Sequence, residues 1–501
     1  MKLKRSLYNI AFGLLSQLII LSLGLIIPRL FLLAYGSEVN GLFSSVGQIF
    51  GYVALLEAGI GAATIQVLYK PVVAGDKSSI NHILSATKKY YKKVSFYYFA
   101  CIVVISLLYP MLIHSNINKL YIGFIVFLQG LSGVINFYFQ ATLKQLLLAE
   151  GKNYIETNVS MMTHIITSFA RVFLILSSAN IVLIQLVYLL TTILEMLFYY
   201  FYFKKKYPWL YLHAKPDFSS LQQKNAFLIH QISGLIFSST DMLLLSFFCS
   251  FKVVSVYAIY NLIFVSLNTL VGTLHNGVSF ALGHTYHENK QEYLKLHDAY
   301  DHYYITFIFS IISLTYILIE PFMKIYTNGI NDIDYIDSYL PFLFCTIQLL
   351  TCTRIISNNL IRIAGHMKKT IPNTIIESCI NLSISLLLVQ DMGLYGVLIG
   401  TICALLYRTT DIIFYANQKI INRSPIKIYK TIGVNCGLFS VVVFLNARFV
   451  LQIGTYFDFI KIGLLLSAII IPIYFIINSI LSMESFRYVY KKIQGKLILR
   501  S

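Results

Sequence analysis

Nine ionisable side chains lie inside long apolar runs of this 501-residue sequence. A charge at the centre of a bilayer costs about 2.5–3.5 kcal/mol unless it is paired or hydrated. Such residues therefore indicate either ion pairs between packed helices or a polar cavity that binds a ligand. The nine are Arg29, Glu57, Arg171, Glu195, Asp241, Arg354, Glu377, Arg408 and Asp411.

Three of the nine, Arg29, Glu57 and Asp241, are interpreted as lining a substrate-binding cavity. Arg29 directly follows Pro28, and a proline inside a helix removes one backbone hydrogen bond and loosens the local ladder. A cavity that holds an arginine can bind an anionic group such as a pyrophosphate. Glu57 and Asp241 are also the carboxylates expected to respond to a coupling ion.

The other six charges lie in predicted helices that would pack within one half of the protein. For these residues, pairing within a lobe is the favoured interpretation, for example Arg354 with Glu377 or Arg171 with Glu195. Arg408 and Asp411 are three residues apart and therefore share one side of a helix. A role of the six residues in ion coupling is the alternative.

Aromatic and amide side chains add polar groups to the predicted eighth span. Tyr257, Tyr260 and Asn261 could hydrogen-bond sugar hydroxyls, and Tyr257 and Asn261 are an i, i+4 pair on one face. Tyr257 is equally well interpreted as an interfacial anchor of the helix. His275 could titrate near neutral pH, but a single histidine in a membrane helix is more often a packed polar residue.

Motifs for covalent or metal-assisted catalysis are absent from the sequence. There is no Walker loop, GxSxG or HExxH pattern, and the seven cysteines are scattered without a CxxC pair. The protein is therefore expected to be a transporter and not an enzyme. No cofactor or metal is expected, and transport would use a Na⁺ or H⁺ gradient, the membrane potential or the substrate gradient.

The elements that must position these residues are membrane-spanning helices. Hydrophobic residues make up 57% of the chain and charged residues 12%, against roughly 25% charged residues in soluble domains. Continuous apolar runs of about 20 residues predict helices and not the alternating strands of a barrel. Fourteen spans are predicted near residues 9–33, 40–68, 94–113, 120–148, 154–177, 180–203, 225–248, 253–283, 302–322, 338–361, 370–390, 393–415, 428–448 and 460–482.

The basic residues predict the orientation of these spans. With both termini in the cytoplasm, the cytoplasmic segments hold 30 of the 39 Lys and Arg residues and the outer loops hold five. This asymmetry agrees with the positive-inside rule and supports an even number of spans. The formal charge of +18 is therefore explained by topology and anionic lipids, and no nucleic-acid partner is expected.

Two similar segments predict an internal repeat. Residues 146–158 follow the fourth span and residues 361–373 follow the tenth, and their glycines, Gly151 and Gly365, are 214 residues apart. Six helices per unit preserve orientation, so the halves would be parallel repeats. The expected organisation is an N-terminal lobe at 1–206, a cytoplasmic linker at 207–224, a C-terminal lobe at 225–420, and two extra helices with a cytoplasmic tail at 421–501.

Several stretches resemble the oligosaccharide flippase, or polysaccharide exporter, family of the multidrug/oligosaccharidyl-lipid/polysaccharide exporter superfamily. They occur in the order typical of the family and spread over nearly the whole chain. They include the first hairpin with its YG…NGL turn and the LYKP motif at the end of the second span. The stretches are Ile27–Ser45, Leu55–Asp76, Thr240–Asn261, Ala364–Leu388 and Gly393–Asp411.

The resemblance implies a V-shaped transporter of a bacterial cytoplasmic membrane, with a cavity lined by helices 1, 2, 7 and 8. It implies an undecaprenyl-pyrophosphate-linked repeat unit for capsule, exopolysaccharide or O-antigen as substrate, with a polysaccharide polymerase and chain-length regulators as partners. Arg29 would hold the pyrophosphate, and helices 13 and 14 could form a groove for the lipid tail. The eighth span lacks the arginine that some family members carry there, so a clamp of two arginines is not expected.

Two alternatives remain at this point. The first is a multidrug or small-solute antiporter of the same fold, which would usually have twelve helices. The second is a membrane polysaccharide polymerase or glycosyltransferase, which would normally need a large outer loop. The longest predicted outer loop, residues 323–337, is short and acidic, with Asp332, Asp334 and Asp337.

Overall fold

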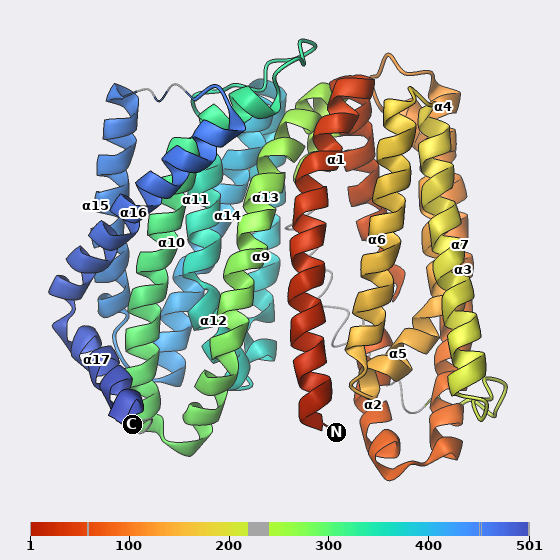
Figure 1. Cartoon of the computed structure of the whole chain (residues 1–501), viewed down its shortest axis with the longest axis horizontal. Helices are drawn as coiled ribbons and strands as arrows, with labels where there is room; N and C mark the ends of the chain where they lie inside the picture. Colours follow the sequence, from red (N-terminus) through yellow and green to blue (C-terminus); the bar gives the residue numbers. More distant parts are fainter. Residues whose placement is uncertain (1, 58–59, 219–239, 450, 452, 499–501) are drawn as a thin grey trace. The chain divides into compact units, whose positions relative to one another are not determined.

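All regular structure in the described part of the chain is helical (Figure 1). The computed structural model describes residues 2–57, 60–218, 240–449, 451 and 453–498. Twelve helices in this part are long and apolar enough to cross a membrane. The protein is therefore an all-α, multi-pass membrane protein, as the apolar runs predict.

The twelve helices and the fourteen predicted spans differ at two places. The stretch Ser22–Glu57 counts as one helix, but Gly36 inside it has φ 79° and ψ 174°, so two predicted spans meet there. Glycine reaches positive φ without the steric penalty of a Cβ atom. The seventh predicted span, 225–248, lies mostly outside the described residues, and its last part, residues 240–248, is helical.

Some helices extend beyond the apolar runs that predict them. Helix α3 begins at Lys77 and α10 at Lys290, whereas the predicted spans begin at residues 94 and 302. The side chains of Asp76 and Asn289 accept hydrogen bonds from first-turn N–H groups, which stabilises these polar helix starts. The predicted C-terminal tail likewise contains a further helix, α17 (Met483–Ile498), with many charged residues.

The chain divides into two compact units, Met1–Ala258 and Ile259–Ser501, with the boundary inside α9. In the first unit, α1 packs against α6, α3 against α4, and α7 against α4 and α6. A π-helical turn, Asn136–Gln140, joins α4 to α5, which packs on α2. The helices are α1 (Lys2–Val53), η1 (Ala54–Glu57), α2 (Ile60–Ala74), α3 (Lys77–Leu112), α4 (Lys119–Ile135), α5 (Ala141–Ala149), α6 (Asn153–Leu176), α7 (Ile181–Lys206) and the start of α9 (Phe251–Glu288).

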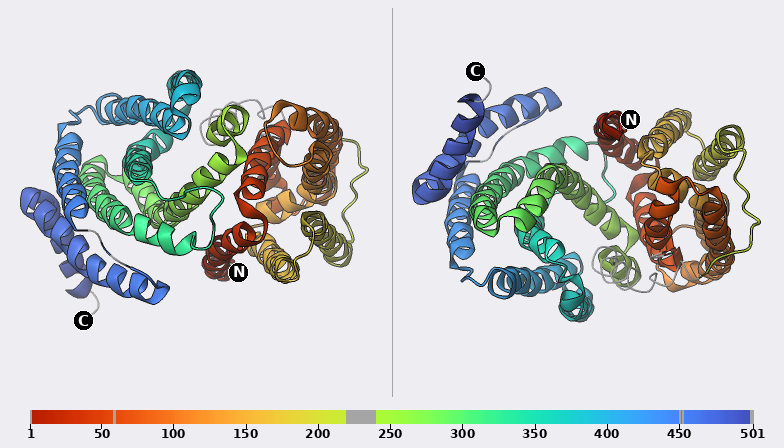
Figure 2. Two further views of the ribbon diagram at one scale, coloured as in Figure 1. Left: turned by 90° about the horizontal axis from the view of Figure 1, so that it is seen from above. Right: turned by 90° about the horizontal axis from the view of Figure 1, so that it is seen from below.

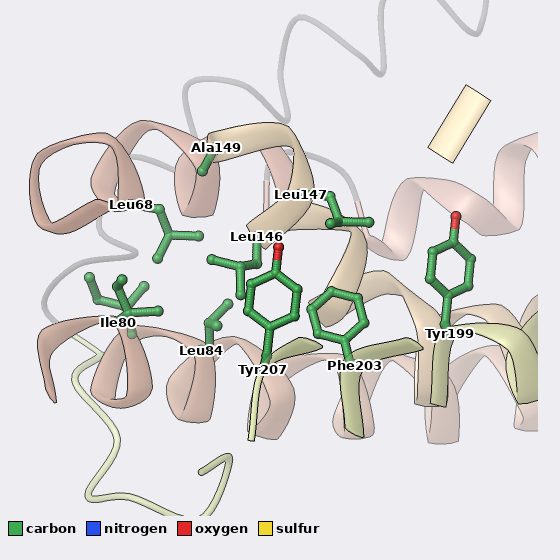
Figure 3. Packing of buried hydrophobic residues seen from close by; sticks show 10 residues of the cluster. Leu68, Ile80, Leu84, Leu146, Leu147, Ala149, Tyr199, Phe203 and Tyr207 are labelled. Carbon is green, nitrogen blue, oxygen red and sulfur yellow. The ribbon is translucent and has the colours of Figure 1, made fainter. Parts of the chain in front are cut away.

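A hydrophobic cluster ties α2, α3, α5 and α7 together in the first unit (Figure 3). Phe203 and Tyr207 stack with ring centroids 4.8 Å apart, and the Tyr207 hydroxyl donates to Glu150 Oε2 at 2.6 Å. The segment after α7 also bonds to α3, because the backbone N–H of Tyr211 donates to Asn81 Oδ1 at 2.9 Å. The beginning of the predicted linker is therefore fixed to the first unit.

In the second unit, α10 contacts α11, α15, α16 and α17, and the last three gather along it in both end views (Figure 2). Helices α13 and α14 pack closely, since a Cβ atom at Gly396 would lie 2.5 Å from the Leu388 carbonyl oxygen. The helices are α10 (Lys290–Tyr326), α11 (Leu340–Thr353), α12 (Ile355–Ile363), η4 (Met367–Thr370), α13 (Ile371–Met392), α14 (Leu394–Tyr415), η5 (Ala416–Ile420), α15 (Ile426–Arg448) and α16 (Tyr456–Leu481).

The two similar sequence segments end their helices in the same way. Gly151 after α5 and Gly365 after α12 have φ 68° and 73°. In each case the N–H of the next residue bonds to the carbonyl five residues earlier: Lys152 to Leu147 at 2.9 Å and His366 to Ile361 at 3.0 Å. This is the Schellman C-cap, which requires a residue with positive φ and therefore favours glycine.

Candidate functional site

Four predicted intramembrane charges lie together in the second unit. Arg354, at the junction of α11 and α12, places Nη1 2.6 Å from Glu377 Oε1 on α13. The other carboxylate oxygen of Glu377 lies 3.5 Å from Arg408 Nε on α14. Arg408 also pairs with Asp411 through Nη1. The predicted Arg354–Glu377 pair is confirmed, and it belongs to a larger cluster of two arginines and two carboxylates.

Neutral polar side chains complete this cluster. The hydroxyl of Thr374 accepts a hydrogen bond from Arg408 Nη2 at 2.9 Å, and the Asn373 amide donates to Asp411 Oδ1 at 2.6 Å. Glu377 and Arg408 are almost completely buried. Because opposite charges balance and each charged group has partners, the cluster joins α11–α14 and has no excess charge to offer a substrate.

The predicted pair of Arg171 and Glu195 is wrong. The Arg171 guanidinium on α6 lies over the ring of Tyr188, 5.2 Å from its centroid. Glu195 on α7 forms a salt bridge of 3.0 Å with Lys144 on α5. Helices α6 and α7 do pack together, but Tyr188 lies at the level of Arg171 on α7, and Glu195 lies two turns farther along that helix.

Asp241 and Tyr257 form a buried pair in the first unit. The Tyr257 hydroxyl donates to Asp241 Oδ2 at 3.0 Å, and both side chains are less than a tenth exposed. Close by in sequence, Thr240 shares a hydrogen bond of 2.6 Å with Tyr52 on α1. Tyr257 is therefore a buried partner of a carboxylate, which argues against the interpretation as an interfacial anchor.

Glu57 ends the short 3-10 turn after α1 and is hydrogen-bonded to α3. The Tyr91 hydroxyl donates to Glu57 Oε1 at 2.8 Å, and the Gln145 amide on α5 donates to the same hydroxyl at 3.3 Å. Gly61 lies against this network, because a Cβ atom there would be 2.9 Å from Gln145 Nε2 and 3.2 Å from Glu57 Oε1. The network therefore places one carboxylate among three helices.

The remaining predicted site residues occupy different surroundings. Arg29 is half-buried on α1, before the break at Gly36. Tyr260 is buried in the second unit, where its hydroxyl donates to the Tyr335 carbonyl at 3.0 Å and its ring stacks on Phe344. Asn261 is half-buried on the same helix. The hydroxyl of Tyr260 thus fixes a loop. Of the two predicted site tyrosines, Tyr257 is the one bonded to a predicted site carboxylate.

The acidic outer loop does not assemble an active site among the described residues. Asp337 Oδ1 accepts hydrogen bonds from the backbone N–H groups of Tyr339 at 2.7 Å and Leu340 at 2.9 Å, so it caps the start of α11. Asp334 accepts from Ile336 N in the same way. In the described ranges, no group of three or more His, Cys, Asp or Glu residues is arranged to hold a metal ion.

Several polar residues of these networks were not predicted. Tyr91 and Lys144 contact predicted carboxylates, and Gln145 contacts Tyr91. Asn373 and Thr374 contact predicted charges. Asn373 and Thr374 lie one turn before Glu377, and this spacing was a detectable signal. Tyr91 is one of 37 tyrosines, and nothing in the sequence distinguishes it from the others.

Comparisons with known proteins show similarity in structure only. No family model matches the sequence, and no curated protein matches it. Lipid II flippase MurJ in an inward closed conformation superimposes with a TM-score of 0.69 at 14% identity, over 95% of this chain and 99% of that one. An inward-facing multidrug resistance MATE family transporter of the MOP superfamily gives 0.63 at 15%, over 79% and 94%.

A MATE structure in a bent conformation gives a TM-score of 0.52 at 16% identity, over 83% of this chain and 95% of that one. These structures are of one lipid II flippase and two MATE proteins. This chain therefore shares the all-helical fold of these structures.

Proposed function

We propose that the protein is a flippase that carries undecaprenyl-pyrophosphate-linked oligosaccharide repeat units across a bacterial cytoplasmic membrane by alternating access. The observation that carries this proposal is the extent of the match to the lipid II flippase. The unmatched 5% of the chain is shorter than α15, α16 and α17 combined, so the match must include part of these helices. The two MATE transporters cover 79% and 83% of the chain. The greater extent of the match to the lipid II flippase thus favours a lipid-linked substrate over a small solute.

The proposed lobes are residues 1–206 and 225–420, joined by the linker at 207–224, with both termini in the cytoplasm. The matching C-caps at Gly151 and Gly365 support two related halves. Transporters built from such repeats alternate between two states by moving one half against the other. The oligosaccharide would serve capsule, exopolysaccharide or O-antigen synthesis, with a polymerase and chain-length regulators acting on the product.

Within this proposal, Arg29 binds the pyrophosphate and the paired carboxylates respond to the coupling ion. Arginine donates several hydrogen bonds in a fixed geometry, which suits phosphate oxygens. Asp241 and Glu57 each accept a hydrogen bond from a tyrosine hydroxyl, and a carboxylate can also accept a proton or contact Na⁺. The charge cluster at Glu377 is assigned to the stability of the second unit.

The test is translocation of a lipid-linked repeat unit in proteoliposomes. We expect Arg29→Ala to lower the transport rate at least about tenfold. Arg29→Lys should retain part of the rate, because lysine keeps the charge but lacks the planar guanidinium that can bind two phosphate oxygens at once. The matched control is Arg448→Ala, which removes an exposed arginine at the end of α15. Unchanged transport by Arg29→Ala would refute the assigned role. Drug efflux without any flipping of lipid-linked sugars would support the antiporter instead.

A further inference from the structure

A cavity of about 1060 Å³ lies in the second unit between α10, α15, α16 and α17. None of the predicted site residues lines it. Helix α17 forms one wall and is fixed to the start of α10, because Tyr488 donates to Glu292 at 2.7 Å and Lys492 pairs with the same carboxylate at 2.8 Å. The hydrogen bond to Glu292 raises the pKa of Lys492, so this contact keeps its charge. These contacts between α10 and α17 therefore hold this wall of the cavity in place.

Positive charge predominates around the cavity. Six Lys and Arg residues line it against three Asp and Glu residues. Two of the acids are already paired: Asp298 with Arg423, and Glu484 with Lys427 at 3.4 Å. The remaining four basic residues are all exposed; Lys295 lies on α10, and the others are Lys430, Arg487 and Lys491. A group that binds here is therefore expected to carry negative charge.

The floor of the cavity is polar and includes one carboxylate. His302 Nδ1 lies 3.0 Å from Thr431 Oγ1, and its Nε2 lies 3.0 Å from the Asn478 carbonyl oxygen. Asp301 is 3% exposed, and its Oδ1 has no hydrogen-bond partner among the described residues. The floor therefore favours a hydrogen-bond donor such as a hydroxyl and repels a second negative group.

The outer surface of α17 indicates where the ligand comes from. Met483, Phe486 and Tyr490 are 47%, 42% and 52% exposed and recur at the three- and four-residue spacing of one helix face. Lys491 and Arg487 lie on the side that lines the cavity. Met483 lines the cavity as well, so the basic residues lie beside the apolar ones on the helix surface. An exposed apolar stripe flanked by basic residues is typical of a membrane interface.

We propose that this cavity binds the headgroup of an anionic phospholipid, with the phosphate at Lys430, Arg487 and Lys491 and the hydroxyl-bearing part of the headgroup towards Asp301. Phosphatidylglycerol has this chemistry. Phosphatidylserine has the same net charge but carries an ammonium and a carboxylate in place of the glycerol hydroxyls, so it has no hydroxyl to donate to Asp301. Phosphatidylcholine has a phosphate without net negative charge or hydroxyls. Binding requires no transport, so it can be measured independently of the flippase proposal.

The test is native mass spectrometry of the purified full chain in detergent with each of the three lipids, and with glycerol phosphate as the soluble form of the headgroup. We expect phosphatidylglycerol to bind at least about tenfold more tightly than phosphatidylcholine, more tightly than phosphatidylserine, and more tightly than glycerol phosphate. Equal binding of phosphatidylglycerol and phosphatidylcholine would overturn the site. Equal binding of phosphatidylglycerol and phosphatidylserine would overturn the role of Asp301.

The variants are chosen to separate this site from general attraction to anionic lipid. Lys430→Ala/Arg487→Ala should weaken phosphatidylglycerol binding about 25-fold, since each surface cation contributes about fivefold. The matched control is Lys204→Ala/Lys205→Ala, which removes the same charge from the exposed end of α7. An equal effect of both double variants, or none from the first, would refute the assignment. Asp301→Asn should bring phosphatidylserine binding closer to that of phosphatidylglycerol.

Discussion

Tyr257 and Asp241 act as one structural group, because the tyrosine hydroxyl donates to the buried carboxylate across 3.0 Å. The sequence indicates them as two separate contacts for a substrate. In the structure, the state of one side chain depends on the other, since a buried carboxylate without a donor is strongly destabilised. Any change of charge at Asp241 would therefore be transmitted to the start of α9.

Tyr257→Phe should destabilise the protein by about 1–3 kcal/mol, because it leaves Asp241 Oδ2 without this donor. Asp241→Asn should cost less, since the amide retains an oxygen that can accept the bond. Thermal unfolding of the purified protein in detergent measures both effects. Tyr211→Phe, at an exposed tyrosine, is the control and should leave the melting temperature unchanged. Equal melting temperatures of Tyr257→Phe and the wild-type protein would contradict the coupling of Tyr257 to Asp241.

The charge cluster of the second unit predicts non-additive mutations. Arg354→Met should cost about 3–5 kcal/mol, because it removes the partner 2.6 Å from buried Glu377. Arg354→Met/Glu377→Gln should cost less than the sum of the two single changes, since no unpaired charge remains. A double-mutant cycle on the free energy of unfolding measures the difference. Additive costs would show that the pair is not coupled.

The control for this cycle is an exposed pair on the same unit. Lys324 and Glu320 on α10 are also close, at 2.7 Å, but both side chains are well exposed. Lys324→Met should therefore change the free energy of unfolding by at most about 1 kcal/mol, because water screens such pairs. If Lys324→Met lowered the free energy of unfolding as much as Arg354→Met, burial would not explain the cost of Arg354→Met.

Two glycines of α1 predict opposite outcomes for the same substitution. A Cβ atom at Gly41 would overlap the Phe251 carbonyl oxygen, so Gly41→Ala requires the backbone at the start of α9 to move. We expect a loss of at least about 2 kcal/mol, comparable with overpacking of a core. Gly47 has nothing within 4 Å of its Cβ position, and Gly47→Ala should be neutral or stabilising. Melting temperatures in detergent compare the two, and similar values would refute the close contact.

The sequence predicts the helices well because apolar run length is a local property. It also predicts the Arg354–Glu377 pair, since the order of helices in one half makes the tenth and eleventh spans neighbours. The Arg171–Glu195 pair fails for a different reason. Helix neighbours follow from chain order, but the depth of a side chain along its partner helix does not, and Arg171 meets Tyr188 instead.

Local irregularities account for other differences. The π-helical turn Asn136–Gln140 rotates the residues that follow it, and it thereby directs Lys144 of α5 towards Glu195. A period of 3.6 residues applied through this span would place Lys144 on another face. Hydropathy likewise does not predict the polar helix starts at Lys77 and Lys290, because hydrogen bonds to the side chains of the N-cap residues stabilise them. The amphipathic α17 has too few apolar residues to register as a span.

Glu57 is the residue at which the coupling ion can be tested most directly. Its carboxylate ends a 3-10 turn, where backbone carbonyls lose their regular helical partners, and Tyr91 donates to only one of its oxygens. A carboxylate beside such carbonyls is suited to a proton or a Na⁺ ion. In proteoliposomes, Glu57→Gln should abolish the dependence of transport on a Na⁺ or pH gradient, because an amide neither titrates nor balances a cation.

Tyr91→Phe separates binding of the ion from loss of the carboxylate. It removes the hydrogen bond between α3 and Glu57, so the gradient dependence should remain while its midpoint shifts. Glu320→Gln, which changes an exposed carboxylate on α10, is the matched control and should leave both unchanged. If transport by Glu57→Gln still followed the gradient as in wild type, the coupling ion would have to bind elsewhere, and the Asp241–Tyr257 pair would be the next group to change.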